Sequence, residues 1–175
     1  VMAMKEKDIT SKENLIKVLN FLEELNIKYW VDGGWGVDIL TGKQNRDHRD
    51  IDIDFDGMYE KVLLKELESK GYKITTDWSP SRIELYHSEL GYLDIHPLLI
   101  NEDGSAKQAA PDGGWYEFEA QWFSSVEFEG RVIPCISAEA QILFHSGYEL
   151  REVDYIDLKN LEILLNDNNN KNLNK

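Results

Sequence analysis

The amino-acid sequence predicts a single α+β domain in which helices flank a mixed, twisted β-sheet. Segments with helical and strand-like apolar spacing alternate in the first half of the chain. Pairs of short strands separated by turn residues follow in the second half. The chain has 175 residues, of which 42% are hydrophobic and 30% are charged, which suits one soluble domain with a sizeable core.

The first half of the chain contains the alternating elements. Apolar residues at helical spacing predict a helix over 12–27, with candidate N-caps at 10–11. A short strand over 29–31 precedes two glycines and a short helix over 35–40. Residues 50–55 alternate between aspartate and apolar side chains, which predicts the next strand.

The segment after this acidic strand returns to helical spacing. A helix is predicted over 58–70, with Val62, Leu63 and Leu67 facing the core and a glycine at its end. Residues 72–75 then begin another strand.

The second half of the chain is predicted to form strands followed by helices. Residues 82–87 and 92–99 are separated by a turn and predict a β-hairpin. The polar segment 101–114 contains Gly and Pro and is predicted to be a loop. The aromatic segment 115–135 is predicted to form strands around a bend, and 138–146 a helix.

The domain is expected to end with a last helix over 154–165. The tail 166–175 is dominated by Asn and Lys, and we predict that it is disordered. One domain is therefore predicted over residues 1–165.

The charge and composition exclude several classes of protein. The formal net charge is −14, which argues against a general nucleic-acid binder because phosphate backbones are held by excess Lys and Arg. No apolar run approaches 18 residues, so we expect no membrane span. Residues 1–6 lack the apolar core of a signal peptide, and the single cysteine, Cys135, fits a reducing compartment. A cytoplasmic protein is expected.

The acidic strand is the main chemical signal in the sequence. Because strand side chains alternate between faces, Asp50, Asp52 and Asp54 share one face. Adjacent carboxylates repel each other, and a hard divalent cation such as Mg²⁺ relieves that repulsion. The alternative is an edge strand with a solvated acidic face. An EF-hand is rejected, because a loop starting at Asp52 would place Leu63 where a bidentate Glu is required.

Two glycines precede the acidic strand and favour a nucleotide site. Gly33 and Gly34 let the backbone approach an anion closely, and the helix after them offers free N–H groups. A cation held by Asp50 and Asp52 could then bridge a bound triphosphate. No Walker A motif is present in the sequence.

Four motifs together resemble a known family. They are Tyr-Trp-Val-Asp-Gly-Gly-Trp-Gly-Val-Asp at 29–38, His-Arg-Asp-Ile-Asp-Ile-Asp-Phe at 48–55, Gly-Tyr-Leu-Asp-Ile-His-Pro at 91–97 and Ile-Pro-Cys-Ile-Ser at 133–137. The chain closely resembles the small lincosamide nucleotidyltransferases of the polymerase β-like superfamily and, more distantly, the aminoglycoside 2″-nucleotidyltransferases. The resemblance implies the nucleotidyltransferase fold and transfer of AMP or another nucleoside monophosphate from an NTP such as ATP, with Mg²⁺, to an antibiotic hydroxyl, releasing pyrophosphate.

The resemblance also implies roles for the carboxylates. Asp50 and Asp52 would hold metal, and a third carboxylate on a neighbouring strand would complete the site and act as the base. Asp94 is our choice for this residue, and Glu84 is the competitor because the strand register is not fixed by the sequence. Asp54 is expected to be a supporting or surface group.

Further residues are assigned by the same resemblance. Arg46 and His48 are expected to contact phosphate, although a loop histidine bonded to backbone is the alternative for His48. Arg49 has opposite strand parity to Asp50 and is expected to be structural. His96 shares parity with Asp94 and could orient it.

The acceptor site is less well defined by the sequence. One group of aromatic residues has two equally good explanations, which are an apolar wall that binds a lincosamide and an ordinary sheet core. The group consists of Trp115, Tyr116, Trp122 and Phe123. The alternatives are transfer to an aminoglycoside or a protein hydroxyl, and a catalytically inactive nucleotide-binding module. Exposed aromatics would also suit a homodimer.

Overall fold

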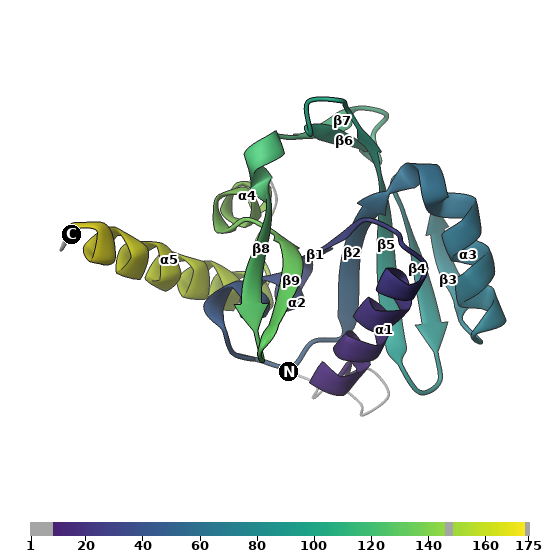
Figure 1. Cartoon of the computed structure of the whole chain (residues 1–175), viewed down its shortest axis with the longest axis horizontal. Coiled ribbons are helices and arrows are strands. Elements are labelled where there is room, and N and C mark those ends of the chain that lie inside the picture. Colours follow the sequence, from purple (N-terminus) through teal and green to yellow (C-terminus); the bar gives the residue numbers. More distant parts are fainter. Residues whose placement is uncertain (1–8, 146–148, 174–175) are drawn as a thin grey trace.

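The computed structural model describes residues 9–145 and 149–173, in which helices flank one mixed β-sheet (Figure 1). The predictions for residues 1–6, 146 and 174–175 lie outside the described residues. In chain order the elements are α1 (Lys12–Glu24), β1 (Tyr29–Asp32), α2 (Gly33–Thr41), β2 (Asp50–Asp56), η2 (Gly57–Tyr59), α3 (Glu60–Ser69), β3 (Lys73–Trp78), β4 (Arg82–His87), β5 (Gly91–Ile100), β6 (Ala106–Ala109), β7 (Trp115–Phe118), η3 (Ala120–Trp122), β8 (Phe123–Phe128), β9 (Arg131–Ile136), α4 (Ala138–Phe144) and α5 (Glu152–Leu173).

The sheet combines parallel and antiparallel pairing, as predicted. Its strands lie in the order β3-β4-β5-β2-β1-β9-β8, and β6 and β7 extend from β5. The acidic strand β2 pairs in parallel with β5 and antiparallel with β1. It therefore lies in the interior of the sheet, which contradicts the edge-strand alternative.

The two faces of β2 have opposite character. Ile51, Ile53 and Phe55 are fully buried in the main core, which also takes in apolar residues of α1 and α3. The aspartates point to the other face of the sheet. Farther along that face, Leu98 of β5 packs in a second apolar cluster with Phe118. The acidic face is thus bordered by an aromatic cluster and not only by solvent.

Most of the predicted elements are confirmed. Ser11 caps α1 by accepting a hydrogen bond from the backbone N–H of Asn14, and Ser137 caps α4 in the same way. Gly42 closes α2 in the left-handed conformation at φ +86°. The hairpin predicted over 82–99 is the antiparallel pair β4–β5.

Three local predictions were wrong. The segment predicted as a loop contains β6, because Ala106 turns into the second cluster and the strand pairs with β5 and β7. The helix predicted from residue 58 begins as the short 3₁₀ turn η2, since Asp56 accepts a hydrogen bond from the N–H of Met58. Val62, predicted to face the core, is 50% exposed, because the buried stripe of α3 runs through Leu63 and Leu67.

The C-terminal helix is longer than predicted. α5 continues through 166–173, where the sequence predicted disorder, and it extends away from the sheet (Figure 1). No Gly or Pro interrupts this stretch, so nothing in it ends the helix once it has started. The division into one domain over 1–165 remains a prediction.

Two expectations from composition can be compared with the fold. Cys135 is buried in the main core, where it fills space among apolar side chains, and burial raises the pKa of its thiol to about 12. Within residues 9–145 and 149–173, none of the helices combines the length and apolar character that a membrane crossing requires.

The contrast between neighbouring residues of α3 gives a first testable prediction. Leu63→Ala should lower the free energy of unfolding by about 2–5 kcal/mol, because it removes a fully buried side chain. Val62→Ala should change it by less than about 0.5 kcal/mol. Urea unfolding of both variants measures the difference, and equal losses would contradict the observed orientation of α3.

Candidate active site

Four carboxylates form a row across four neighbouring strands. Asp32 of β1 pairs with Asp52 of β2, which pairs with Asp94 of β5, which pairs with Glu84 of β4. Because directly paired residues project from the same face, all four side chains share one side of the sheet. We call these residues the acid row. The register therefore places both candidates for the third carboxylate, Asp94 and Glu84, on the face that carries Asp52.

Asp50 and Asp54 flank the acid row on β2. Repulsion from the Asp52 carboxylate, together with burial, raises the pKa of Asp50 to about 7. Asp54 is fully buried, and burial raises its pKa well above the usual range. Asp54 was expected to be a supporting or a surface group, and its burial excludes the surface alternative. Its strand partner is Trp30, which packs against the second cluster.

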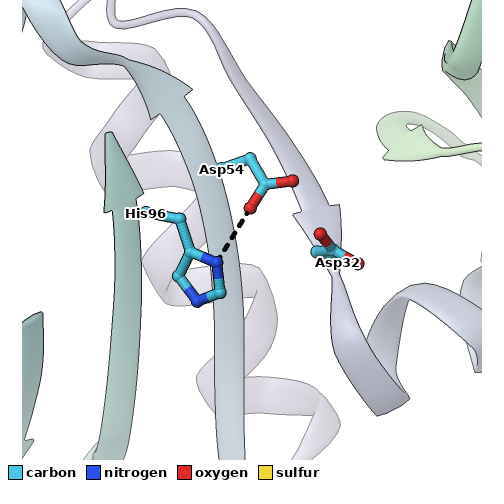
Figure 2. Close-up of side chains that lie close together, drawn as sticks. All are labelled: Asp32, Asp54 and His96. Carbon is cyan, nitrogen blue, oxygen red and sulfur yellow. Dashed lines mark ion pairs between the residues drawn. The ribbon is translucent and has the colours of Figure 1, made fainter. Parts of the chain in front are cut away.

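His96 lies between the carboxylates of the two strands. Its Nε2 is 3.4 Å from Asp94 Oδ1 and 3.6 Å from Asp52 Oδ1, and its Nδ1 is 3.3 Å from Asp54 Oδ1. Figure 2 shows the ring beside Asp54, with Asp32 across from them. Burial disfavours the charged imidazole, but the surrounding carboxylates outweigh it and raise the pKa of His96 well above its ordinary value. In the metal-free chain an imidazolium therefore offsets part of the negative charge.

An arginine pairs with the buried carboxylate of the acid row. Arg82 of β4 donates to Asp94, which is 1% exposed, and its guanidinium stacks on Trp78 at 4.0 Å. Burial alone would raise the pKa of Asp94, but the contacts with His96 and Arg82 lower it. Asp94 is thus an ionised carboxylate held in a fixed place.

Arg49 occupies the opposite side of the row. Its Nη1 donates to Glu84 Oε2 at 3.0 Å and lies 3.5 Å from Asp50 Oδ2, and its guanidinium stacks on Tyr92 at 3.9 Å. Arg49 was predicted to be structural. It does fix Glu84, but it also lines the cleft beside Asp50 and presents a cation there.

Glycine is required at positions 33 and 34 because the backbone there lies very close to side chains of the acidic strand and of the segment before it. A Cβ on Gly33, whose φ is +62°, would lie 2.1 Å from Asp52 Oδ2. A Cβ on Gly34 would lie 2.4 Å from Arg46 Nη2 and 2.6 Å from His48 Nδ1. The glycines thus bring the N-terminus of α2 against the carboxylates, as the motif predicted.

Arg46 and His48 each have a protein partner. Arg46 donates from Nε and Nη2 to the two oxygens of Asp157 in α5, both at 2.9 Å. His48 is 2% exposed, and its Nε2 lies 2.5 Å from Asp38 Oδ2. Both residues line the cleft, and their contact with phosphate remains a prediction.

A cleft of about 1150 Å³ opens beside the acid row, of which Asp32 and Asp52 line it. One part is polar and includes the glycines, Asp50 and Asp52, whereas the other part is lined by residues of β6, β7, α4 and α5. Of the four predicted aromatics only Tyr116 lines it, because Trp122 and Phe123 pack in the second cluster and Trp115 lies outside. Phe118 lines the cleft in their place.

Sequence reasoning missed several residues of the cleft. Arg82 has the same strand parity as Glu84, and this signal could have found it. His145 lines the cleft with its Nε2 at 3.6 Å from Asp154 Oδ1. Asp154 and Asp157 carry no local signal, because only the packing of α5 brings them to the site.

The site fits a divalent cation. Asp52, Asp94 and His96 each offer a ligand atom within 4.8 Å of the others, and Asp94 Oδ1 is buried without a hydrogen-bond partner among the described residues. The raised pKa of Asp50 shows that the negative charge here is not fully compensated. Of the predicted trio, the structure brings Asp52 and Asp94 together, whereas the place of Asp50 in the metal set remains a prediction.

Several known proteins are similar to this chain in sequence and in fold. A lincosamide resistance protein from Staphylococcus haemolyticus is 56% identical over 159 residues, which are 91% of this chain and 98% of that protein. The lincomycin-bound crystal structure of the lincosamide antibiotic adenylyltransferase LnuA superposes with a TM-score of 0.84 at 54% identity, covering 89% of this chain and 99% of that one. A 2″-aminoglycoside nucleotidyltransferase from Klebsiella pneumoniae is 28% identical over 86% of this chain and 80% of its own length.

The fold and the acid row, together with these similarities, define the class of protein, which is a nucleotidyltransferase. The chain belongs to the aminoglycoside-2″-adenylyltransferase family, whose model matches residues 14–161. The resemblance drawn from the four sequence motifs is confirmed.

Proposed function

We propose that this protein inactivates lincosamide antibiotics by transferring AMP from Mg·ATP to an antibiotic hydroxyl, with release of pyrophosphate. The observation that carries the proposal is the meeting of Asp52 and Asp94 with the N-terminus of α2 at one end of a large cleft. The similarity to LnuA, whose structure contains lincomycin, supports the choice of acceptor.

The residues that line the polar part of the cleft suit an NTP. The N–H groups at the start of α2 and the positive end of its dipole favour the triphosphate, and Arg49 and Arg82 add cations on either side of the acid row. Asp52 and Asp94, with Asp50 beside them, would hold Mg²⁺. Bound there, the ion would neutralise charge on the phosphates and lower the pKa of the acceptor hydroxyl.

The chemistry is a displacement at the α-phosphorus. The acceptor oxygen forms a bond to phosphorus, the bond to pyrophosphate breaks, and the hydroxyl proton passes to a carboxylate. Asp94 is our proposed base, because it is ionised and adjacent to Asp52 in the sheet. Glu84 is bound by Arg49 and by the hydroxyl of Thr75, which donates to Glu84 Oε1 at 2.8 Å, just as Asp94 is bound by Arg82, so the choice of Asp94 depends on its pairing with Asp52.

The other half of the cleft suits the antibiotic. Tyr116 and Phe118 give it aromatic faces, whereas the buried Gln108 adds an amide. Asp154 contributes a carboxylate that would attract a protonated amine. Because lincosamides and aminoglycosides both carry amines, the aromatic lining is what favours a lincosamide.

Pyrophosphate release tests the reaction type. With ATP, Mg²⁺ and lincomycin, the wild-type protein should release pyrophosphate in proportion to the antibiotic consumed. Asp50→Asn should release almost none. Binding of Mg·ATP without pyrophosphate release in the presence of lincomycin, kanamycin or candidate protein acceptors would instead favour an inactive nucleotide-binding module.

Paired substitutions test the identity of the base. Asp94→Ala should reduce kcat by on the order of 10²–10⁴-fold, the usual contribution of a general base, and should also weaken metal binding. Glu84→Ala should leave most of the activity, because its structural partner Arg49 can still pair with Asp50. Steady-state kinetics of both variants measure this, and loss of turnover in Glu84→Ala alone would reverse the assignment.

The assembly and location of the enzyme also belong to the proposal. We place it in the cytoplasm, where ATP is available. A homodimer remains a prediction; Tyr155 and Ile163 of α5 are apolar and exposed, which suits such an interface. Light scattering would measure the mass in solution, and a monomer at micromolar concentration would contradict the dimer.

A further inference from the structure

His96 separates two groups of carboxylates on the acidic face. Its Nε2 faces Asp52 and Asp94, and its Nδ1 faces Asp54. Nε2 and Asp94 Oδ1 are both buried, and neither has a hydrogen-bond partner among residues 9–145 and 149–173. These two polar atoms face each other at 3.4 Å, within ion-pair distance but without a hydrogen bond, and this is also the spacing of neighbouring ligands around one ion.

The buried carboxylate of Asp54 explains the orientation of the ring. Asp54 Oδ1 lies 3.3 Å from Nδ1, within ion-pair distance, as drawn in Figure 2, and Nε2 faces the acid row. Histidines that bind metal through one nitrogen usually donate from the other to a carboxylate, which fixes the tautomer. Asp54, His96 and the pair Asp52/Asp94 have this arrangement.

We infer that His96 Nε2 is a ligand of the cation held by Asp52 and Asp94, with Asp54 as its orienting partner, and that the centre therefore binds Mn²⁺ more tightly than Mg²⁺. The inference rests on the cation site of the proposed function. Imidazole nitrogen is a good ligand for first-row transition metals, whereas Mg²⁺ strongly prefers oxygen.

The other side of the ring is a poorer place for the ion. Asp32, Asp54 and His96 also bring ligand atoms within 4.8 Å of one another. However, Asp32 already caps α2 by accepting from the N–H of Gly33 at 2.8 Å, and Asp54 is fully buried. Asp52, like Asp32, lines the cleft, so a cation on the Nε2 side can meet a bound triphosphate.

Electron spin-echo spectroscopy of bound Mn²⁺, with and without ATP, tests the inference. The wild-type protein should show nitrogen coupling to Mn²⁺, and ¹⁵N-histidine labelling should change that coupling, which separates a histidine ligand from the nitrogens of adenine. His96→Gln should abolish the coupling and weaken Mn²⁺ binding by on the order of tenfold or more, with a smaller effect on Mg²⁺. His145→Gln, a second histidine of the cleft, should keep both.

The outcomes separate the inference from the function it rests on. Bound Mn²⁺ without histidine nitrogen coupling in the wild type would overturn the inference and leave the cation site intact. Failure of the wild type to bind Mn²⁺ even with ATP would contradict the proposed cation site itself. Loss of Mn²⁺ binding in Asp52→Asn would support an ion bound between His96 Nε2 and the pair Asp52/Asp94. Loss of binding in Asp32→Asn alone would instead place the ion between Asp32 and Asp54. The labelling result does not depend on any variant folding.

Discussion

Asp52→Asn is expected to reduce nucleotidyl transfer by on the order of 10³-fold and, without metal, to raise the melting temperature. Asp52 lies between Asp32 and Asp94 in the acid row, against the start of α2. In the proposed mechanism its loss removes a cation ligand, and a bound cation contributes several kcal/mol of charge stabilisation to such a transition state. Initial rates with ATP and lincomycin measure the first effect.

The stability effect has a defined dependence on pH. Repulsion and burial raise the pKa values of Asp50 and Asp52 above the ordinary 3.8, so the folded chain binds more protons than the unfolded chain. Stability is therefore lost as pH rises from about 4 through the raised values, near 7 for Asp50. The gain in Asp52→Asn should be larger at pH 8 than at pH 5, as measured by thermal melting in EDTA.

Magnesium should reverse the difference in stability between the wild type and Asp52→Asn. Adding Mg²⁺ should raise the melting temperature of the wild type, because the ion offsets the repulsion, and should have little effect on Asp52→Asn. A purely structural acidic face would also be stabilised by the substitution. It would show no difference in the response to Mg²⁺, and that result would contradict the metal site.

Gly33→Ala is expected to reduce activity by on the order of 10²-fold or more, since displacements of about 1 Å can have effects of that size. The new Cβ would lie 2.1 Å from Asp52 Oδ2, so either the carboxylate or the start of α2 must move. The left-handed backbone at φ +62° adds a steric penalty of about 1–2 kcal/mol. Kinetics and urea unfolding of the same preparation measure both effects.

Gly42→Ala is the matched control for this substitution. Gly42 closes the same helix in the left-handed region at φ +86°, but a Cβ there would meet nothing within 4 Å. We expect a similar loss of stability with activity retained. Equal losses of activity in the two variants would show that backbone strain, and not contact with Asp52, explains the requirement for glycine.

Local patterns in the sequence predicted the elements that carry the site. The alternation of aspartate with Ile51, Ile53 and Phe55 predicted both the strand and its acidic face, because side-chain direction in a strand depends only on parity. The glycine pair predicted close approach, and the hairpin followed from two strand-like runs around a turn. These signals are contained within a few residues of chain.

Features that depend on tertiary packing could not be predicted in this way. The register between β4 and β5 determines that Asp94 and Glu84 share a face, and no local residue specifies it. Arg46 pairs with Asp157 only because α5 returns to the cleft. Asp54 carries the same signal as Asp50, yet it is fully buried and lies beside His96.

Mass spectrometry of the products tests the central claim most directly. Lincomycin and kanamycin would each be incubated with the protein, ATP and Mg²⁺, with Asp50→Asn as the control. We predict an AMP adduct on lincomycin alone, absent with the variant. An adduct on kanamycin and none on lincomycin would keep the chemistry and contradict the proposed acceptor, and no adduct on either would contradict the proposed antibiotic inactivation.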